Sequence, residues 1–141
     1  MAKRWRLPTV DTQFWIDMEW WDDQDRDIRV YMRELLCDSC RSEYAESVLS
    51  DEEVDWVDEE TGEVTRVDAL WHTIRTCCSV KPGYVTPTTP MVDALFRTFL
   101  ANGNMPLTVR ELYERLDRRP PKIWLRVLSS KVQMGIRPVY D

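Results

Sequence analysis

The most regular hydrophobic pattern in the chain begins after residue 88. Thr89 and Pro90 fit the first positions of a helix, and Asn102-Gly103-Asn104 fits its end. Between these points, apolar side chains recur at helical spacing and make one face. They are Val92, Leu95, Phe96, Phe99 and Leu100. The pattern predicts a first C-terminal helix.

Two further helices are predicted downstream. Thr108 and Glu111 fit a capping box, and Leu107 and Leu112 occupy the hydrophobic staple positions around it. Pro120-Pro121 ends this second helix and starts a third. The apolar positions of the third helix are Ile123, Trp124, Val127 and Leu128. The tail that follows contains Gly135 and is predicted to form a short strand or wing.

The N-terminal pattern is consistent with two structures. Phe14, Met18 and Trp21 recur at helical spacing after a possible cap at Asp11-Thr12. In the same stretch, apolar residues 14, 16, 18 and 20 alternate with polar ones, which is strand spacing. We favour the helix. A second helix is predicted from Asp22-Asp23, with an apolar stripe over residues 28–36 that continues directly into the first cysteines.

The middle of the chain predicts a hairpin and a helix. Residues 42–53 are polar and acidic, which indicates a helix extension followed by an exposed loop. Two β-rich arms at 54–67 flank a Glu60-Thr61-Gly62 turn, which is typical of a β-hairpin. A helix is expected from Asp68 to the cysteines at 77 and 78. Its inward side chains are Leu70, Trp71 and Ile74.

Residues 79–90 contain Pro82, Gly83, Pro87 and Pro90 and are the best candidate for a linker. We therefore predict a mainly α fold with a small β-hairpin. A helical, cysteine-containing subdomain would occupy residues 1–80, and a three-helix module would occupy residues 81–141.

Charge is distributed unevenly between these two parts. Residues 1–80 hold 9 Lys and Arg against 20 Asp and Glu, a balance of −11. Residues 81–141 hold 10 Lys and Arg against 5 Asp and Glu, a balance of +5. The asymmetry indicates either two surfaces with different partners or two halves that attract each other.

The order of helix, short loop, capped helix, tight turn, helix and glycine-containing tail over residues 88–140 resembles the helix-turn-helix and winged-helix superfamily. In its DNA-binding members, the second helix of the pair enters the major groove. The resemblance implies that Lys122 and Arg126 face DNA, with Arg118, Arg119 and Lys131 near phosphates. The alternative is a helix-turn-helix that packs against or docks a protein.

The four cysteines form a candidate metal site. Cys37-x-x-Cys40 has the spacing of half a zinc knuckle, and Cys77 and Cys78, with His72 as an alternative ligand, could supply the other half. Adjacent Cys77 and Cys78 can act together only at a turn of the chain. Unligated cysteines packed as small hydrophobes and a redox Cys-x-x-Cys pair are the other interpretations.

Catalytic motifs are missing from the sequence. It contains one histidine and has no Gly-rich phosphate loop, G-x-S-x-G or HExxH motif. We therefore expect a non-enzyme. Six of the seven tryptophans precede residue 80, and Trp15, Trp20 and Trp21 are candidates for a protein-partner or homodimer interface. The remaining possibility is that they belong to the core.

The sequence has no apolar run of the length that a membrane span needs and no secretory signal at its start. We expect a cytoplasmic protein whose cysteines are reduced or bind structural zinc. The leading hypothesis is a small nucleic-acid-associated protein, with DNA the favoured nucleic acid and a resemblance to transcription regulators. The second hypothesis is an adaptor or a subunit of a larger assembly.

Overall fold

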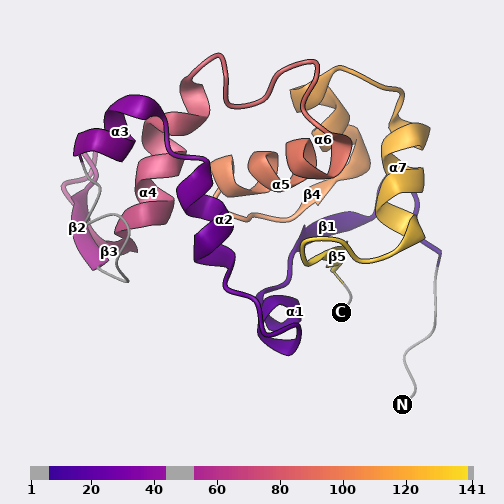
Figure 1. The fold of residues 1–141 in the computed structure, drawn as a ribbon, viewed down its shortest axis with the longest axis horizontal. Coiled ribbons are helices and arrows are strands. Elements are labelled where there is room, and N and C mark those ends of the chain that lie inside the picture. The colour runs from indigo at the N-terminus through magenta and orange to yellow at the C-terminus, as the bar shows by residue number, and fades with distance from the viewer. Residues whose placement is uncertain (1–6, 44–52, 140–141) are drawn as a thin grey trace. The chain divides into compact units, whose positions relative to one another are not determined.

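The computed structural model describes residues 7–43 and 53–139. Over these residues it contains seven α-helices, one short 3-10 helix and five β-strands (Figure 1). The predicted mainly α fold with small β elements is confirmed. The chain forms two compact units: unit 1 is Met1–Arg26 with Pro87–Asp141, and unit 2 is Asp27–Thr86. This division differs from the 1–80 and 81–141 ranges, because the N-terminal segment belongs with the C-terminal helices.

Unit 1 contains the three predicted C-terminal helices: α5 (Met91–Ala101), α6 (Val109–Leu116) and α7 (Pro121–Ser130). The capping box is present: Thr108 Oγ1 accepts a hydrogen bond from the Glu111 amide at 3.2 Å, and Glu111 Oε1 accepts one from the Thr108 amide at 3.0 Å. The apolar faces meet in one core. It includes Leu95, Phe96, Phe99, Leu100, Leu112 and Trp124, all at most 1% exposed.

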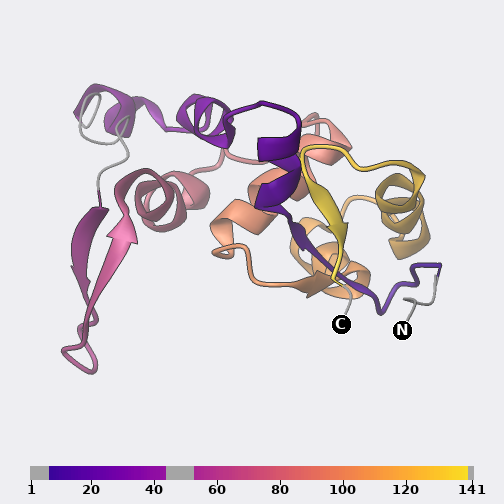
Figure 2. The ribbon, with the colours of Figure 1, turned by 90° about the horizontal axis from the view of Figure 1, so that it is seen from below.

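A three-stranded antiparallel sheet completes unit 1. Its strands are β1 (Gln13–Ile16), β4 (Leu107–Thr108) and β5 (Ile136–Pro138), in the order β4-β1-β5. Figure 2 shows the indigo N-terminal strand beside the yellow C-terminal one. The central strand therefore comes from the N-terminal part of the chain, whereas its two neighbours come from the C-terminal part.

The helix prediction over residues 14–16 is wrong, and the alternating pattern is the correct interpretation. Phe14 and Ile16 are buried, whereas Gln13 and Trp15 are exposed. β4 and β5 supply the backbone partners that make a strand favourable there. The helix α1 (Met18–Asp23) begins only after Asp17, whose side chain accepts a hydrogen bond from the Glu19 amide.

Unit 2 contains α2 (Ile28–Glu34), α3 (Asp38–Glu43), β2 (Glu53–Val57), β3 (Val64–Asp68), α4 (Ala69–Thr76) and the 3-10 turn η1 (Cys78–Val80). The predicted hairpin is confirmed by the pairing of β2 with β3. Asp68 begins α4, as expected, by accepting a hydrogen bond from the Trp71 amide at 3.0 Å.

The predicted second helix has different bounds from those expected. Asp27, and not Asp22-Asp23, caps α2, because its side chain accepts a hydrogen bond from the Arg29 amide. The helix ends at Glu34 and a separate helix starts at Asp38. Arg29 forms an ion pair with Asp68 that joins α2 to the start of α4. Most of the predicted acidic loop, residues 44–52, lies outside the described residues.

Candidate metal centre and basic helix face

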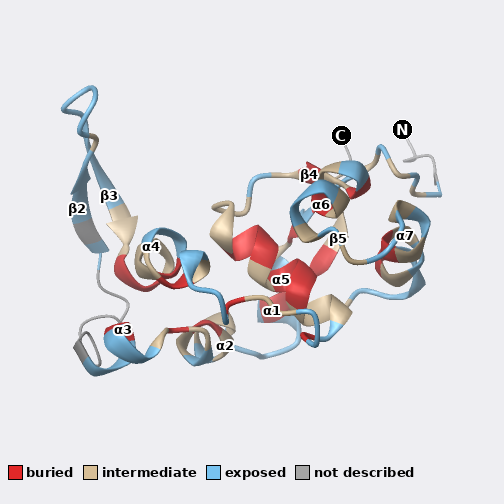
Figure 3. Ribbon diagram, turned by 90° about the horizontal axis from the view of Figure 1, so that it is seen from above, coloured by how far each residue is buried: buried red, intermediate tan, exposed pale blue. Residues whose placement is uncertain are grey.

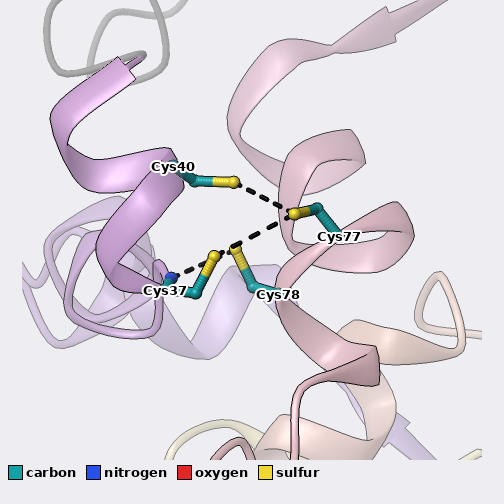
Figure 4. Close-up of side chains that lie close together, drawn as sticks. All are labelled: Cys37, Cys40, Cys77 and Cys78. Carbon is teal, nitrogen blue, oxygen red and sulfur yellow. Dashed lines mark hydrogen bonds between the residues drawn. The ribbon is translucent and has the colours of Figure 1, made fainter.

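The four cysteines converge in unit 2, although 36 residues separate Cys40 from Cys77 in the sequence. Their sulfur atoms all lie within 4.8 Å of one another. Figure 4 shows Cys37 and Cys40 on one side, and Cys77 and Cys78 on the other. The Sγ atoms of Cys40 and Cys77 are 3.2 Å apart, and those of Cys37 and Cys77 are 4.0 Å apart.

These separations fit a tetrahedral metal site. With metal–sulfur bonds of about 2.3 Å, the sulfur atoms of a four-thiolate site are about 3.8 Å apart. The observed spacings bracket that value. A disulfide requires about 2.05 Å between sulfur atoms, and all four cysteines are free thiols in this structure. The four-cysteine cluster (Cys37, Cys40, Cys77 and Cys78) could therefore hold one metal ion.

Local structure explains how the pairs converge. Cys37 precedes α3, and Cys40 lies in its first turn, so their spacing puts both thiols on one side of the helix start. Cys77 ends α4 with φ −121° and ψ −61°, and Cys78 begins η1. Because the helix breaks at Cys77, the adjacent side chains of Cys77 and Cys78 can both reach the cluster. We expected such a turn of the chain from the sequence.

Hydrogen bonds to sulfur link the two halves of the cluster. The Cys37 amide donates to Cys78 Sγ at 3.2 Å. Cys37 Sγ lies 3.4 Å from Ser39 Oγ. The Ser39 hydroxyl, followed by the Cys40 amide, lowers the pKa of the Cys37 thiol to about 6. The residue spacing gave no indication of these bonds.

Burial has the opposite effect on two of the other thiols. It raises the pKa of Cys40 and that of Cys78, because a thiolate there would lose its solvation. In the absence of a cation the cluster favours a mixture of protonated and ionised sulfurs. A divalent cation at its centre would supply the missing charge and favour four thiolates.

The alternative ligand His72 is not among the clustered side chains of the described residues. Its ring lies 5.8 Å from the ring of Trp56, from centre to centre. Partial burial and the nearby Arg75 lower the pKa of His72. It is therefore a packing residue of α4 against the hairpin.

The predicted nucleic-acid residues lie on or beside α7. Lys122 and Arg126 are exposed one turn apart, and Ser129 is exposed one turn further along the same face. Arg119 and Lys131 are exposed just before and just after the helix. Among the described residues, none of these four cations is in an ion pair. We call Arg119, Lys122, Arg126 and Lys131 the basic face.

Arg118 has a different role from the basic face. Its side chain is half-buried, and Nη1 donates to the Thr89 carbonyl at 2.6 Å. Its guanidinium lies 5.9 Å from the centre of the Trp124 ring. Arg118 therefore ties the α6–α7 turn to the start of α5, a contact that sequence spacing could not indicate.

The three candidate interface tryptophans are placed differently from one another. Trp15 is 37% exposed on the outer side of β1, and Trp20 is half-buried. Trp21 is 2% exposed and its indole N–H donates to the Met134 carbonyl at 3.0 Å. Trp21 is thus a core residue and cannot be part of a surface interface in this fold.

Among the described residues there is no helix with the length and apolar character that crossing a membrane requires. Comparison of the chain with protein-family models, with curated proteins and with solved structures gave no match. The four-cysteine cluster and the basic face are therefore the features from which a function can be inferred.

Proposed function

We propose that this is a small DNA-binding protein, resembling a transcription regulator, in which α7 contacts the duplex. The observation that carries the proposal is the basic face, whose four cations are exposed and have no acidic partner among the described residues. Such cations release counterions from the phosphate backbone and so supply salt-dependent affinity. Ser129 adds a hydroxyl that can donate to or accept from a base edge.

The architecture of unit 1 supports a winged-helix type of unit. α5, α6 and α7 follow the order of a three-helix core, and α7 is the second helix of the helix-turn-helix pair. The sequence predicted a short strand or wing in the tail that contains Gly135. The sheet has three strands because β1 lies between β4 and β5. The proposed wing region is thus built from both ends of the chain.

We infer that the ion in the four-cysteine cluster is structural zinc. Four thiolates form a closed tetrahedral set with no open position for a water or substrate, which is typical of structural rather than catalytic zinc. Soft thiolate ligands also select zinc over magnesium or calcium. The free thiols are consistent with a reducing, cytoplasmic location.

The test is a titration of the zinc-loaded full chain against duplex DNA at several salt concentrations. Affinity should fall as salt rises. The double variant Lys122→Ala and Arg126→Ala should bind more weakly and reduce the log–log salt slope by about 0.9 for each phosphate that the variant no longer neutralises. Both side chains are exposed, so the fold should be retained.

A matched control removes two exposed cations from unit 2, through Arg75→Ala and Lys81→Ala. This variant has the same change in net charge and should bind DNA almost as the parent does. Equal reductions in affinity for both variants would show a non-specific charge effect and contradict a role for α7. Absence of salt-dependent binding by the parent would contradict the proposed function itself.

The second candidate function is a protein-interaction adaptor. Exposed Trp15, the apolar side chain on the outer side of β1, is the observation that favours it. Under this hypothesis, Trp15→Ala would weaken co-purification of a protein, and the α7 double variant would not. The DNA titration distinguishes the two functions directly.

A further inference from the structure

The β2–β3 hairpin of unit 2 carries a surface that neither the metal centre nor α7 uses. We call residues 53–68 the acidic hairpin. It holds seven carboxylates and one arginine, a balance of −6. In Figure 3 most of both strands and their turn are coloured as exposed. Among the described residues, β2 and β3 form a two-stranded sheet, so each strand has one edge without a strand partner.

Some of these charges already have structural roles. Asp58 Oδ1 accepts hydrogen bonds from the Glu60 and Thr61 amides and so fixes the turn. Arg66 lies 3.6 Å from Glu53 and 4.0 Å from Asp55. Asp68 pairs with Arg29 and caps α4. The carboxylates left without a partner in this part of the structure are Glu59, Glu60 and Glu63.

Next to these three glutamates is an exposed apolar pair. Val57 and Val64 are direct partners in the hairpin register, and they are 53% and 58% exposed. Directly opposite residues lie on the same face of a sheet. Solvent therefore meets two adjacent valines at the turn end of the hairpin, next to the segment 58–63 that contains the three glutamates. Each strand has one edge without a strand partner among the described residues.

We propose that the acidic hairpin docks an extended, cationic protein segment that adds to the unpaired edge of β2 or β3 and places an apolar side chain beside the valine of that strand, Val57 or Val64. The negative charge of the hairpin favours a positively charged partner. Nucleic acid is repelled by a balance of −6, and so is the hairpin of a second copy. A lysine- or arginine-rich strand gains electrostatic complementarity with the glutamates and backbone hydrogen bonds along the edge. This interaction goes beyond DNA binding and does not depend on α7.

The experiment measures binding of a short labelled peptide of alternating lysine and valine to the zinc-loaded full chain, by fluorescence anisotropy and amide chemical shifts. The expected result is binding with shifts concentrated at Glu53–Val57 or Val64–Asp68. The same peptide with its central residue replaced by proline should bind less well, because proline cannot complete a ladder of hydrogen bonds.

Two variants test the surface. Glu59→Lys with Glu60→Lys and Glu63→Lys should weaken peptide binding at least about tenfold, because like charges would then face each other. Val57→Ser with Val64→Ser should weaken it several-fold through the apolar contact. The matched control reverses three exposed acids of α1, through Glu19→Lys, Asp22→Lys and Asp23→Lys. It should change the affinity by less than about twofold, since it makes the same change in net charge and leaves the charges of the acidic hairpin intact.

The proposal is overturned if the peptide does not bind, if shifts fall outside the acidic hairpin, or if the α1 control loses as much affinity as the hairpin variant. None of these results bears on DNA binding by α7, which is measured separately. A glutamate–valine peptide of equal length should show no binding, and equal binding of that peptide would also overturn the proposal.

Discussion

Gly135 lies at a position where backbone conformation and space both exclude other residues. Its φ is +79°, and a Cβ there would lie 2.7 Å from Trp21 Nε1 and 3.0 Å from the Asp17 carbonyl oxygen. Gly62, in the hairpin turn, has a similar φ of +73° but nothing within 4 Å of a Cβ. The two glycines share the backbone constraint and differ only in packing.

We predict that Gly135→Ala destabilises unit 1 much more than Gly62→Ala destabilises unit 2. The positive φ costs about 1–2 kcal/mol at either position, and overpacking against Trp21 adds about 1–3 kcal/mol at Gly135. Denaturant titrations followed by amide resonances of each unit measure both values. Equal destabilisation at the two sites would show that Trp21 does not pack against Gly135.

His72 provides a pH-dependent prediction, because it is the single histidine of the chain. Burial lowers the pKa of His72 in the folded state. As the pH falls below 6.5, the imidazole therefore binds a proton more readily in the unfolded chain than in the folded one. The free energy of unfolding should therefore decrease as pH falls from 6.5 through the folded pKa, and His72→Gln should lack this contribution. An NMR titration of the imidazole should give a midpoint below 6.5, and a midpoint above that value would contradict the packing against Trp56.

At the scale of the element, β1 shows why the N-terminal segment belongs to unit 1. Phe14 is fully buried in the central strand, whereas neighbouring Trp15 is 37% exposed on the other side. Phe14→Ala should lower the free energy of unfolding of unit 1 by about 3–5 kcal/mol. Trp15→Ala should cost about 1 kcal/mol or less.

Denaturant unfolding of the full chain, followed through amide signals of α5, α6 and α7, measures this pair of variants. If Phe14→Ala leaves those helices as stable as in the parent, the strand order β4-β1-β5 is incorrect. It also follows that residues 81–141 alone lack their central strand, so the full chain is the proper material for every binding test.

Local signals in the sequence predicted several elements correctly. Three of these are the Thr108–Glu111 capping box, the Asp68 cap and the hairpin. Each depends on residues that are close together in the sequence, so a short sequence pattern is enough to predict it. The strand β1 was predicted as a helix because its partners lie more than 90 residues away. The Arg118 contact with Thr89 was missed for the same reason, since only the fold brings those groups together.

The four-cysteine cluster lies between these two cases. The Cys37-x-x-Cys40 spacing and the adjacent Cys77-Cys78 pair indicated the candidate ligands. Their convergence depends on α4 ending at Thr76 and on the packing of α2 against α4, which no local pattern specifies. His72 was a plausible ligand by spacing, but it packs against Trp56 instead.

At the scale of the whole molecule, the two units should depend differently on metal. Unit 2 has a small core, with Met32, Leu36, Leu70 and Ile74 among its few buried side chains. Domains of this size commonly need a metal or disulfides to fold. Binding of structural zinc contributes about 10–16 kcal/mol in small zinc-binding peptides. Unit 1 has a larger core and none of the four clustered cysteines.

The most direct test is an amide NMR spectrum of the zinc-loaded full chain before and after a strong chelator, with native mass spectrometry to count bound metal. We predict one zinc ion per chain, and on its removal a selective collapse of resonances from Asp27–Thr86 while those of α5, α6 and α7 persist. Added zinc should restore the spectrum. A folded unit 2 in a chain shown to be free of metal would contradict a structural role for zinc.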